Sequence, residues 1–156
     1  MKTPIFRLAT LNDIPQLVEL RIQMQKEVNG LAHSKIGLEF YKTAADYFQK
    51  SLNDGSYISA VAELNDQIIS ANGIVFYNKP PSLPNGSGLV GYLTNVYTIP
   101  IFRGNGFATH LIDLLTTKAR QLKADKIHLG TTELGKGIYE RSGFKPVCFT
   151  ALELKL

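Results

Sequence analysis

The fold is decided by LVGYLTNVYTI-PIF-RGNGFATHLIDLLTTKARQL, residues 89–122 of the chain. Its first part, Leu89–Ile99, is rich in β-branched and aromatic residues and predicts a buried strand that ends at Pro100, because proline cannot donate to a sheet ladder. From Phe107 to about Lys123, apolar residues recur at helical spacing and predict an amphipathic helix. A strand, a glycine-bearing turn and a helix start favour an anion site, because glycines let a ligand approach the unpaired N–H groups of the first helical turn. We therefore expect a phosphate-bearing ligand at residues 103–109.

The spacing of the glycines distinguishes between the classes of phosphate-bearing ligand that this turn could bind. A dinucleotide fingerprint beginning at Gly104-Asn-Gly106 needs Gly or Ala at position 109, where Thr109 stands. Residues 130–136 (GTTELGK) match the start of a nucleotide P-loop, but Gly137 occupies the position whose Ser or Thr hydroxyl holds magnesium. Neither nucleotide motif is complete.

Two other motifs favour a third kind of phosphate-bearing ligand. Arg103, Gly106 and Ala108 fill the three fixed positions of R/Q-x-x-G-x-G/A, and YERSGF at residues 139–144 is similar to a late Y-E-[KR]-x-G-F segment. In this order and some thirty residues apart, the motifs resemble those of the GNAT N-acetyltransferase superfamily. The segment RLAT at residues 7–10 resembles the family's first strand, so the resemblance covers nearly the whole chain.

The resemblance implies an α/β (α+β) fold in one domain, residues 1–156, with a mixed, mostly antiparallel sheet of six to seven strands and about four helices on both faces. In this family two central strands splay apart to admit the cofactor. Alternating helical and strand patterns with hairpins agree with this architecture. The elements expected from the residue patterns are strands at 5–9, 57–64, 67–77, 89–99, 126–130 and 145–156, and helices at 14–28, 36–52, 107–123 and 134–142.

The implied reaction is transfer of an acetyl group from acetyl-coenzyme A to the primary amine of a small metabolite, peptide or protein, by direct attack on the thioester in a ternary complex. The resemblance places the cofactor against the end of the central strand and against the turn and helix start that follow, with two further contacts after the next strand. The expected cofactor-binding residues are Val96, Tyr97, Thr98, Arg103, Gly104, Asn105, Gly106, Phe107, Ala108, Thr109, Thr132 and Gly135. Arg103 either adds positive charge or closes the turn.

The catalytic residues are less well defined by the sequence. Tyr139 is the expected acid that protonates the leaving thiolate, as the tyrosine of this segment does in many relatives; its alternative role is packing against the preceding long helix. Some relatives carry a glutamate on the strand before this segment, where this chain has IHLG at residues 127–130. Glu133 is therefore the first candidate base and His128 the second, each of which could instead be a solvated surface residue. Asn95 is expected to orient the acceptor.

Composition excludes several other classes of protein. The net charge of +4 comes from scattered residues, 17 basic and 13 acidic, so nucleic acid is not expected as a partner. No apolar run is long enough to span a membrane, and no signal-peptide core precedes the first strand. A single Cys148 suits a reducing cytoplasm. The three histidines, at positions 33, 110 and 128, form no metal-ligand cluster with it, so no metal is expected.

Two points remain open at this stage. The absence of an obvious base is also compatible with a non-catalytic acyl-coenzyme A binding module, which would act as a sensor or regulatory subunit. Terminal strands of this family often pair between subunits, so a homodimer is a further expectation.

Overall fold

The chain forms one sheet with strand order β1-β2-β3-β4-β5. The structure is a computed structural model that describes residues 3–31, 36–83 and 86–156. His33, one of the three histidines for which no role as a metal ligand was predicted, lies outside the described residues. Neighbouring strands are antiparallel from β1 to β4, whereas β5 runs parallel to β4, which confirms a mixed, mostly antiparallel sheet. The strands are β1 (Ile5–Leu8), β2 (Tyr57–Leu64), β3 (Gln67–Asn78), β4 (Leu89–Thr98) and β5 (Lys126–His128).

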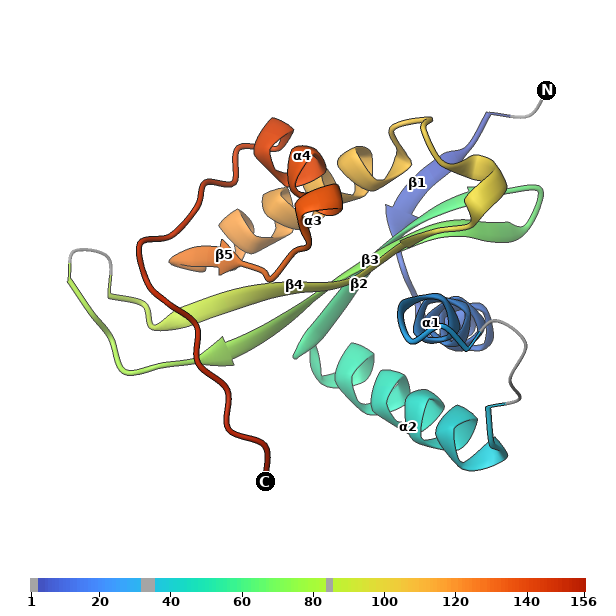
Figure 1. Ribbon diagram of the computed structural model, residues 1–156, viewed down its shortest axis with the longest axis horizontal. Helices are drawn as coiled ribbons and strands as arrows, with labels where there is room; N and C mark the ends of the chain where they lie inside the picture. Colours follow the sequence, from blue (N-terminus) through green and yellow to red (C-terminus); the bar gives the residue numbers. More distant parts are fainter. Residues whose placement is uncertain (1–2, 32–35, 84–85) are drawn as a thin grey trace.

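Helices cover both faces of the sheet, as expected (Figure 1). One face carries α1 (Ile14–Val28) and α2 (Leu38–Asp54), and the other carries α3 (Phe107–Gln121) and α4 (Glu133–Arg141). Short 3-10 turns precede α1 and α3, at Leu11–Asp13 and Pro100–Phe102. Pro100 thus ends β4 and opens the turn that leads into α3.

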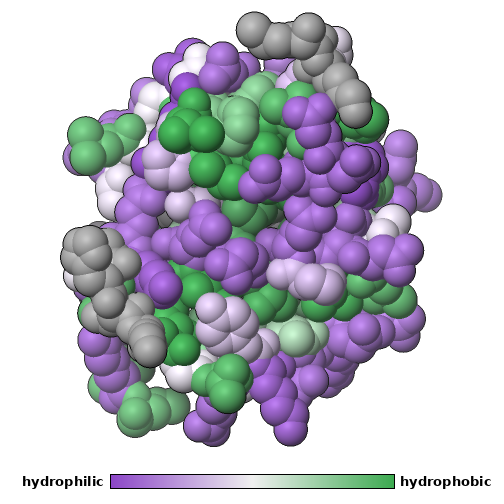
Figure 2. All heavy atoms as spheres, turned by 90° about the vertical axis from the view of Figure 1, so that its right-hand side faces the viewer, coloured by the Kyte–Doolittle hydropathy of each residue, from purple (hydrophilic) through white to green (hydrophobic). Residues whose placement is uncertain are grey.

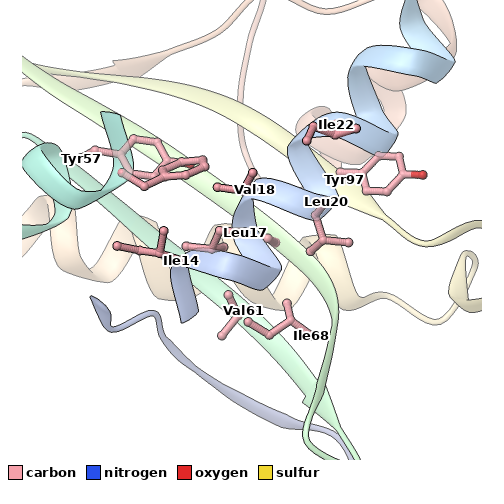
Figure 3. Packing of buried hydrophobic residues seen from close by; sticks show 11 residues of the cluster. Ile14, Leu17, Val18, Leu20, Ile22, Tyr57, Val61, Ile68 and Tyr97 are labelled. Atoms are coloured by element: carbon pink, nitrogen blue, oxygen red, sulfur yellow. The ribbon is translucent and has the colours of Figure 1, made fainter. Parts of the chain in front are cut away.

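Each face has its own apolar core, because successive residues of a strand point to opposite sides of the sheet. Figure 3 shows the core under α1, where this helix lies across the strands and Tyr57 and Tyr97 mark the two ends of the cluster. The core under α3 is built from alternate strand residues and from the helix's apolar stripe. Its fully buried members include Ala60, Ile69, Ile74, Leu111, Ile112 and Leu115.

The hairpin between β2 and β3 confirms a local prediction. Its two turn residues, Asn65 and Asp66, have φ angles of 52° and 63°, and Leu64 pairs with Gln67 across the turn. A two-residue turn with two positive φ angles matches the twist of the flanking strands, and Asn and Asp tolerate this conformation better than other non-glycine residues.

The prediction of a strand at residues 145–156 is wrong. Within the described residues the sheet has five strands, where six to seven were predicted. This segment has no regular secondary structure, and Leu152, Leu154 and Leu156 are fully exposed or nearly so. Its alternating pattern satisfies the side-chain period of a strand, but a strand also needs a neighbouring backbone to pair with. The strand expected at residues 126–130 is likewise shorter, because β5 leaves β4 after His128.

An ion-pair network holds the sheet's first strand to α1. Arg7 in β1 donates to both carboxylate oxygens of Asp13, at 2.8 Å each, and to Glu63 of β2 at 2.6 Å. The Thr10 amide also donates to Asp13, at 2.7 Å, as the predicted helix-start pair requires. Together these donors hold the pKa of the Asp13 carboxyl down at about 2, chiefly through the Arg7 hydrogen bond.

The end of the molecule seen from the right of Figure 1 carries a band of hydrophilic side chains with apolar ones above and below it (Figure 2).

Among the described residues, no helix is long and apolar enough to cross a membrane.

Candidate functional site

The site begins where β4 and β5 part. The two strands pair only from Val90 with Lys126 to Tyr92 with His128, and β4 then continues to Thr98 without β5 beside it. A bulge lies in this free arm of β4, because the register with β3 shifts opposite residues 71–73 and Asn95 has a φ of 54°. An extra residue in a strand bends it and re-aims its side chains, so the bulge helps to open the sheet here.

The turn after β4 has the geometry of an anion-binding loop. Gly104 and Gly106 have φ angles of 82° and 76°, and Gly106 is the N-cap of α3. The first intrahelical bond runs from the His110 N–H to the Gly106 carbonyl, which leaves the amides that precede it free for a ligand. The Asn105 side chain donates to the carbonyls of Phe102 and Arg103, at 3.0 and 3.2 Å, and holds the turn in shape.

A cavity of about 620 Å³ extends from this turn along the free arm of β4 to α4. All twelve residues that the sequence assigned to the cofactor line it, and so does Tyr139. A cavity of this volume is within the range of small-molecule and cofactor sites. The structure thus brings together residues from β4, the turn, α3 and α4 that lie up to about forty positions apart in the chain.

The α4 wall of the cavity is shaped by Thr132, Gly135 and Tyr139. The Thr132 hydroxyl caps α4 by accepting from the Gly135 N–H, at 3.3 Å, so it is already engaged within the protein. A Cβ on Gly135 would lie 2.8 Å from the Thr131 hydroxyl and 3.7 Å from the Tyr139 ring. Tyr139 packs edge-on against Phe144, and burial raises the pKa of its phenol above the ordinary value. This phenol therefore stays protonated throughout the neutral range.

Arg103 closes the turn. Its Nε donates to the Thr98 carbonyl at 3.0 Å, and its guanidinium lies 5.5 Å from the centre of the Tyr97 ring. The same guanidinium pairs with Glu27 of α1 at 2.7 Å and lowers the pKa of that carboxyl. The positive charge that Arg103 brings to the turn is therefore compensated by Glu27, and the turn's ability to hold an anion depends mainly on its backbone amides.

Two expected site residues lie outside the cavity lining. Glu133 is the exposed first residue of α4. Asn95 is buried at the bulge and donates to the Tyr57 hydroxyl at 3.2 Å, while its Oδ1 is buried without a partner in the described part of the chain. Burial raises the pKa of Tyr57 to about 12, so this hydroxyl keeps its proton throughout the neutral range.

The comparisons with known proteins agree with this geometry. The profile of the acetyltransferase (GNAT) family matches residues 26–144. The chain belongs to the GNAT acetyltransferase family. No curated protein matches it.

Solved structures of similar shape include three acetyltransferases. A predicted acetyltransferase from Clostridium acetobutylicum, crystallised with acetyl-CoA, is 33% identical, with a TM-score of 0.85 over 98% of this chain and 96% of that one. A GCN5-related N-acetyltransferase from Ralstonia eutropha JMP134 is 22% identical, with a TM-score of 0.78 over 97% and 99% of the two chains. Glucosamine-6-phosphate N-acetyltransferase from Arabidopsis thaliana is 17% identical, with a TM-score of 0.73 over 98% and 99%. The last two share the fold.

The sequence missed part of the lining of this GNAT cleft. One wall is formed by Met24, Glu27 and Val28 at the end of α1, and Phe102, Ile138 and Arg141 complete the remainder. Phe102, Ile138 and Arg141 lie within or beside the two recognised motifs, so the motifs themselves were the available signal. The α1 residues carry no such signal, because only the packing of α1 across β3 and β4 brings them to the cleft.

The cleft fits a long ligand with phosphate groups at one end. Free amides and two left-handed glycines lie at the turn, and the apolar and aromatic surface of β4 and α4 lies beyond it. In the described ranges, no three His, Cys, Asp or Glu side chains are arranged to hold a metal ion.

Proposed function

We propose that this GNAT protein transfers the acetyl group of acetyl-coenzyme A to a primary amine of a small metabolite, peptide or protein, by direct attack within a ternary complex. One observation carries the proposal: a single cavity joins the free amides after Gly104, the arm of β4 that has no pairing with β5, and the half-buried phenol of Tyr139. Acetyl-coenzyme A supplies the activated acetyl thioester, as it was present in the crystals of the similar clostridial protein.

The turn is proposed to bind the pyrophosphate through the amides of residues 104–109, which point from the positive end of α3. The edge of β4 that faces away from β3 at Val96, Tyr97 and Thr98 would hold the pantetheine arm in the manner of an added strand, because β5 pairs only with residues 90–92 and no strand occupies this part of that edge in the described residues. Thr132 and Gly135 line the far wall of the cavity, on α4.

Tyr139 is the proposed acid. Its raised pKa keeps the phenol protonated at neutral pH, and its position in the cavity wall allows it to donate to the thiolate as that group leaves. A thiol of pKa about 8.5 is a good leaving group, so this donation accelerates the reaction without being indispensable.

Asn95 is the proposed contact to the acceptor. Its Oδ1 is a buried hydrogen-bond acceptor without a partner in the described residues, and an amine N–H satisfies such an atom. Glu133 is exposed and lies outside the cavity, so any role in removing the amine's proton would act through water.

The test measures cofactor binding and thiol release separately. Thermal unfolding with acetyl-coenzyme A at 100 times its Kd is expected to show about 2.7 kcal/mol of added stability. Thiol release from acetyl-coenzyme A is then followed with a panel of primary amines. Stabilisation without amine-dependent thiol release would support the acyl-coenzyme A sensor instead, and no stabilisation would refute both functions.

We further propose a homodimer joined through the C-terminal segment, residues 147–156. Its large apolar side chains are exposed in one chain: Val147 at 71%, Phe149 at 81% and Leu152 at 93%. Contiguous exposed apolar residues of this kind mark interaction surfaces. Light scattering of the full chain and of a chain ending at residue 146 measures this directly: the first is expected to be a dimer and the second a monomer, and a monomeric full chain refutes the pairing.

A further inference from the structure

Asn72 lies in the middle of β3, directly opposite the bulge of β4. Its two neighbours on β3 pair with Tyr97 and Thr94 of β4. Two residues of β4, Asn95 and Val96, therefore lie opposite this one residue, as in a β-bulge. The edge of β4 that is proposed to hold the pantetheine arm begins at Val96. Asn72 thus lies beside the start of that edge, and its side chain is fully buried.

The side chain of Asn72 connects this point with the first turn of α3. Its neighbour Ala71 belongs to the core under α1, so Asn72 points to the other face of the sheet, on which α3 packs (Figure 1). There its Nδ2 donates to the Ala108 carbonyl at 2.9 Å. A carbonyl oxygen only accepts hydrogen bonds, so the atom that faces it must be the amide nitrogen. Ala108 is the second residue of α3, lines the cavity and is one of the residues proposed to bind the pyrophosphate.

Stability alone does not explain an amide at this position. The Oδ1 of Asn72 is buried without a partner in the described part of the chain. Leaving such an acceptor unpaired costs at least as much free energy as one neutral hydrogen bond contributes. The Ala108 carbonyl does not need the donor either, because a carbonyl in the first turn of a helix accepts from the N–H four residues later. The bond between Asn72 and Ala108 therefore fixes the position of α3 without adding net stability.

The other contacts of α3 define its position less closely. The helix is held on the sheet by its apolar stripe, and hydrophobic attraction has no preferred direction. Residues 99–106 connect it to β4, and this connection contains the two left-handed glycines of the turn. The hydrogen bond from Asn72 is directional, and in the part of the chain that the structure describes no other side-chain hydrogen bond joins a strand to α3.

Given the cofactor site proposed above, on which this inference rests, we propose that Asn72 is a positioning residue that holds the first turn of α3 in register with the bulged edge of β4. Coenzyme A spans both parts, with its pyrophosphate at the turn and its pantetheine arm along the edge. A ligand that occupies two subsites gains affinity when the protein already aligns them. A ligand that occupies only one of them gains nothing from the alignment. The difference between the two kinds of ligand therefore measures the role of Asn72.

The experiment compares coenzyme A with its nucleotide half, 3′-phosphoadenosine 5′-diphosphate, which carries the pyrophosphate but no pantetheine arm. The Kd of each ligand is measured by titration calorimetry, and the free energy of unfolding by denaturant. Asn72→Leu, which keeps a similar side-chain volume and removes the donor, should weaken the binding of coenzyme A by about tenfold or more. Its Kd for the nucleotide half and its free energy of unfolding should stay close to the wild-type values.

Ser59→Ala is the matched control. Ser59 is fully buried on β2, and its hydroxyl donates to the Asn72 carbonyl at 3.1 Å. This variant therefore removes a buried side-chain hydrogen bond to the same residue and leaves the contact with α3 intact. It should bind both ligands as the wild type does.

An Asn72→Leu protein with the wild-type Kd for coenzyme A overturns the inference. An equal loss of affinity for both ligands overturns it too, because it would show that the turn itself is distorted, and so does the same selective loss in Ser59→Ala. If Asn72→Leu does not fold, Asn72→Ala removes the donor without added bulk and is judged by the same two Kd values. Failure of the wild-type protein to bind coenzyme A or to acetylate any amine refutes the proposed function instead, so the two failures are distinguishable.

Discussion

Replacing Gly106 with alanine isolates the contribution of the turn's backbone to cofactor binding. Gly106 has a φ of 76° at the N-cap of α3, and a Cβ there would have His110 Nδ1 as its nearest neighbour, at 4.0 Å. The methyl group meets no clash, so the whole penalty is that of a left-handed backbone with a side chain, about 1–2 kcal/mol. For a chain of this size each kcal/mol lowers Tm by about 2–4 °C, which gives an expected drop of about 2–8 °C.

Gly55→Ala is the matched control. Gly55 has a φ of 78° at the end of α2, and its added Cβ would also meet nothing within 4 Å. Both variants should lose similar stability, measured by thermal or denaturant unfolding. Only Gly106→Ala should weaken the binding of coenzyme A, by about tenfold or more, because relief of its strain turns the neighbouring amides away from the ligand; this corresponds to about 1.4 kcal/mol in titration calorimetry. An unchanged Kd in Gly106→Ala, together with the expected loss of stability, would refute the reasoning that these amides bind the pyrophosphate.

Three further predictions concern other groups. Asp13→Asn should remove about 2 kcal/mol of the free energy of unfolding at neutral pH, because the folded protein holds the pKa of this carboxyl at about 2. The carboxylate's contribution is complete above its ordinary pKa and disappears as pH falls towards 2. The unfolding curves of the two proteins should therefore coincide near pH 2. Tyr139→Phe should lower kcat by about 10²-fold in the thiol-release assay, the lower end of the range for a general acid, with little change in the Kd of coenzyme A. An unaltered kcat across pH would exclude the acid role. Glu27→Gln leaves the positive charge of Arg103 uncompensated, so coenzyme A should bind more tightly at low salt. The Kd should return to the wild-type value near about 0.5 M salt, where charges are screened. Equal affinities of the two proteins at low salt would show that the ion pair does not affect the turn.

The elements that the sequence predicted well are those defined by local rules. The strand that ends at Pro100, the hairpin at Asn65 and Asp66, and the helix after Gly106 each follow from periodicity and turn chemistry over a few residues. The turn at residues 103–109 was predicted as a binding loop for the same reason, since left-handed glycines and free amides are properties of a short segment; the structure shows that its residues line the cavity. That these residues line one cavity together with residues of α1 and α4 is a property of the tertiary structure.

The predictions that failed or were incomplete depended on partners far away in the chain. Residues 145–156 have a strand pattern, yet the structure shows no strand there, because a strand forms only beside another backbone. Glu27 could not be connected with Arg103 from the sequence, and the pairing of Tyr77 with His128 joins residues 51 positions apart. Such contacts are set by sheet register and helix packing.

The amino-acid sequence by itself therefore determined the order of the elements, the family motifs and the turn that offers free amides, because each depends on conformational preferences within a few residues. Tertiary structure alone decided where β4 and β5 separate, that α1 forms one wall of the cleft, and that the side chain of Asn72 donates to the first turn of α3. These depend on the bulge at Asn95, on strand register and on the packing of helices across the sheet, each of which is fixed by the whole fold and by no single segment.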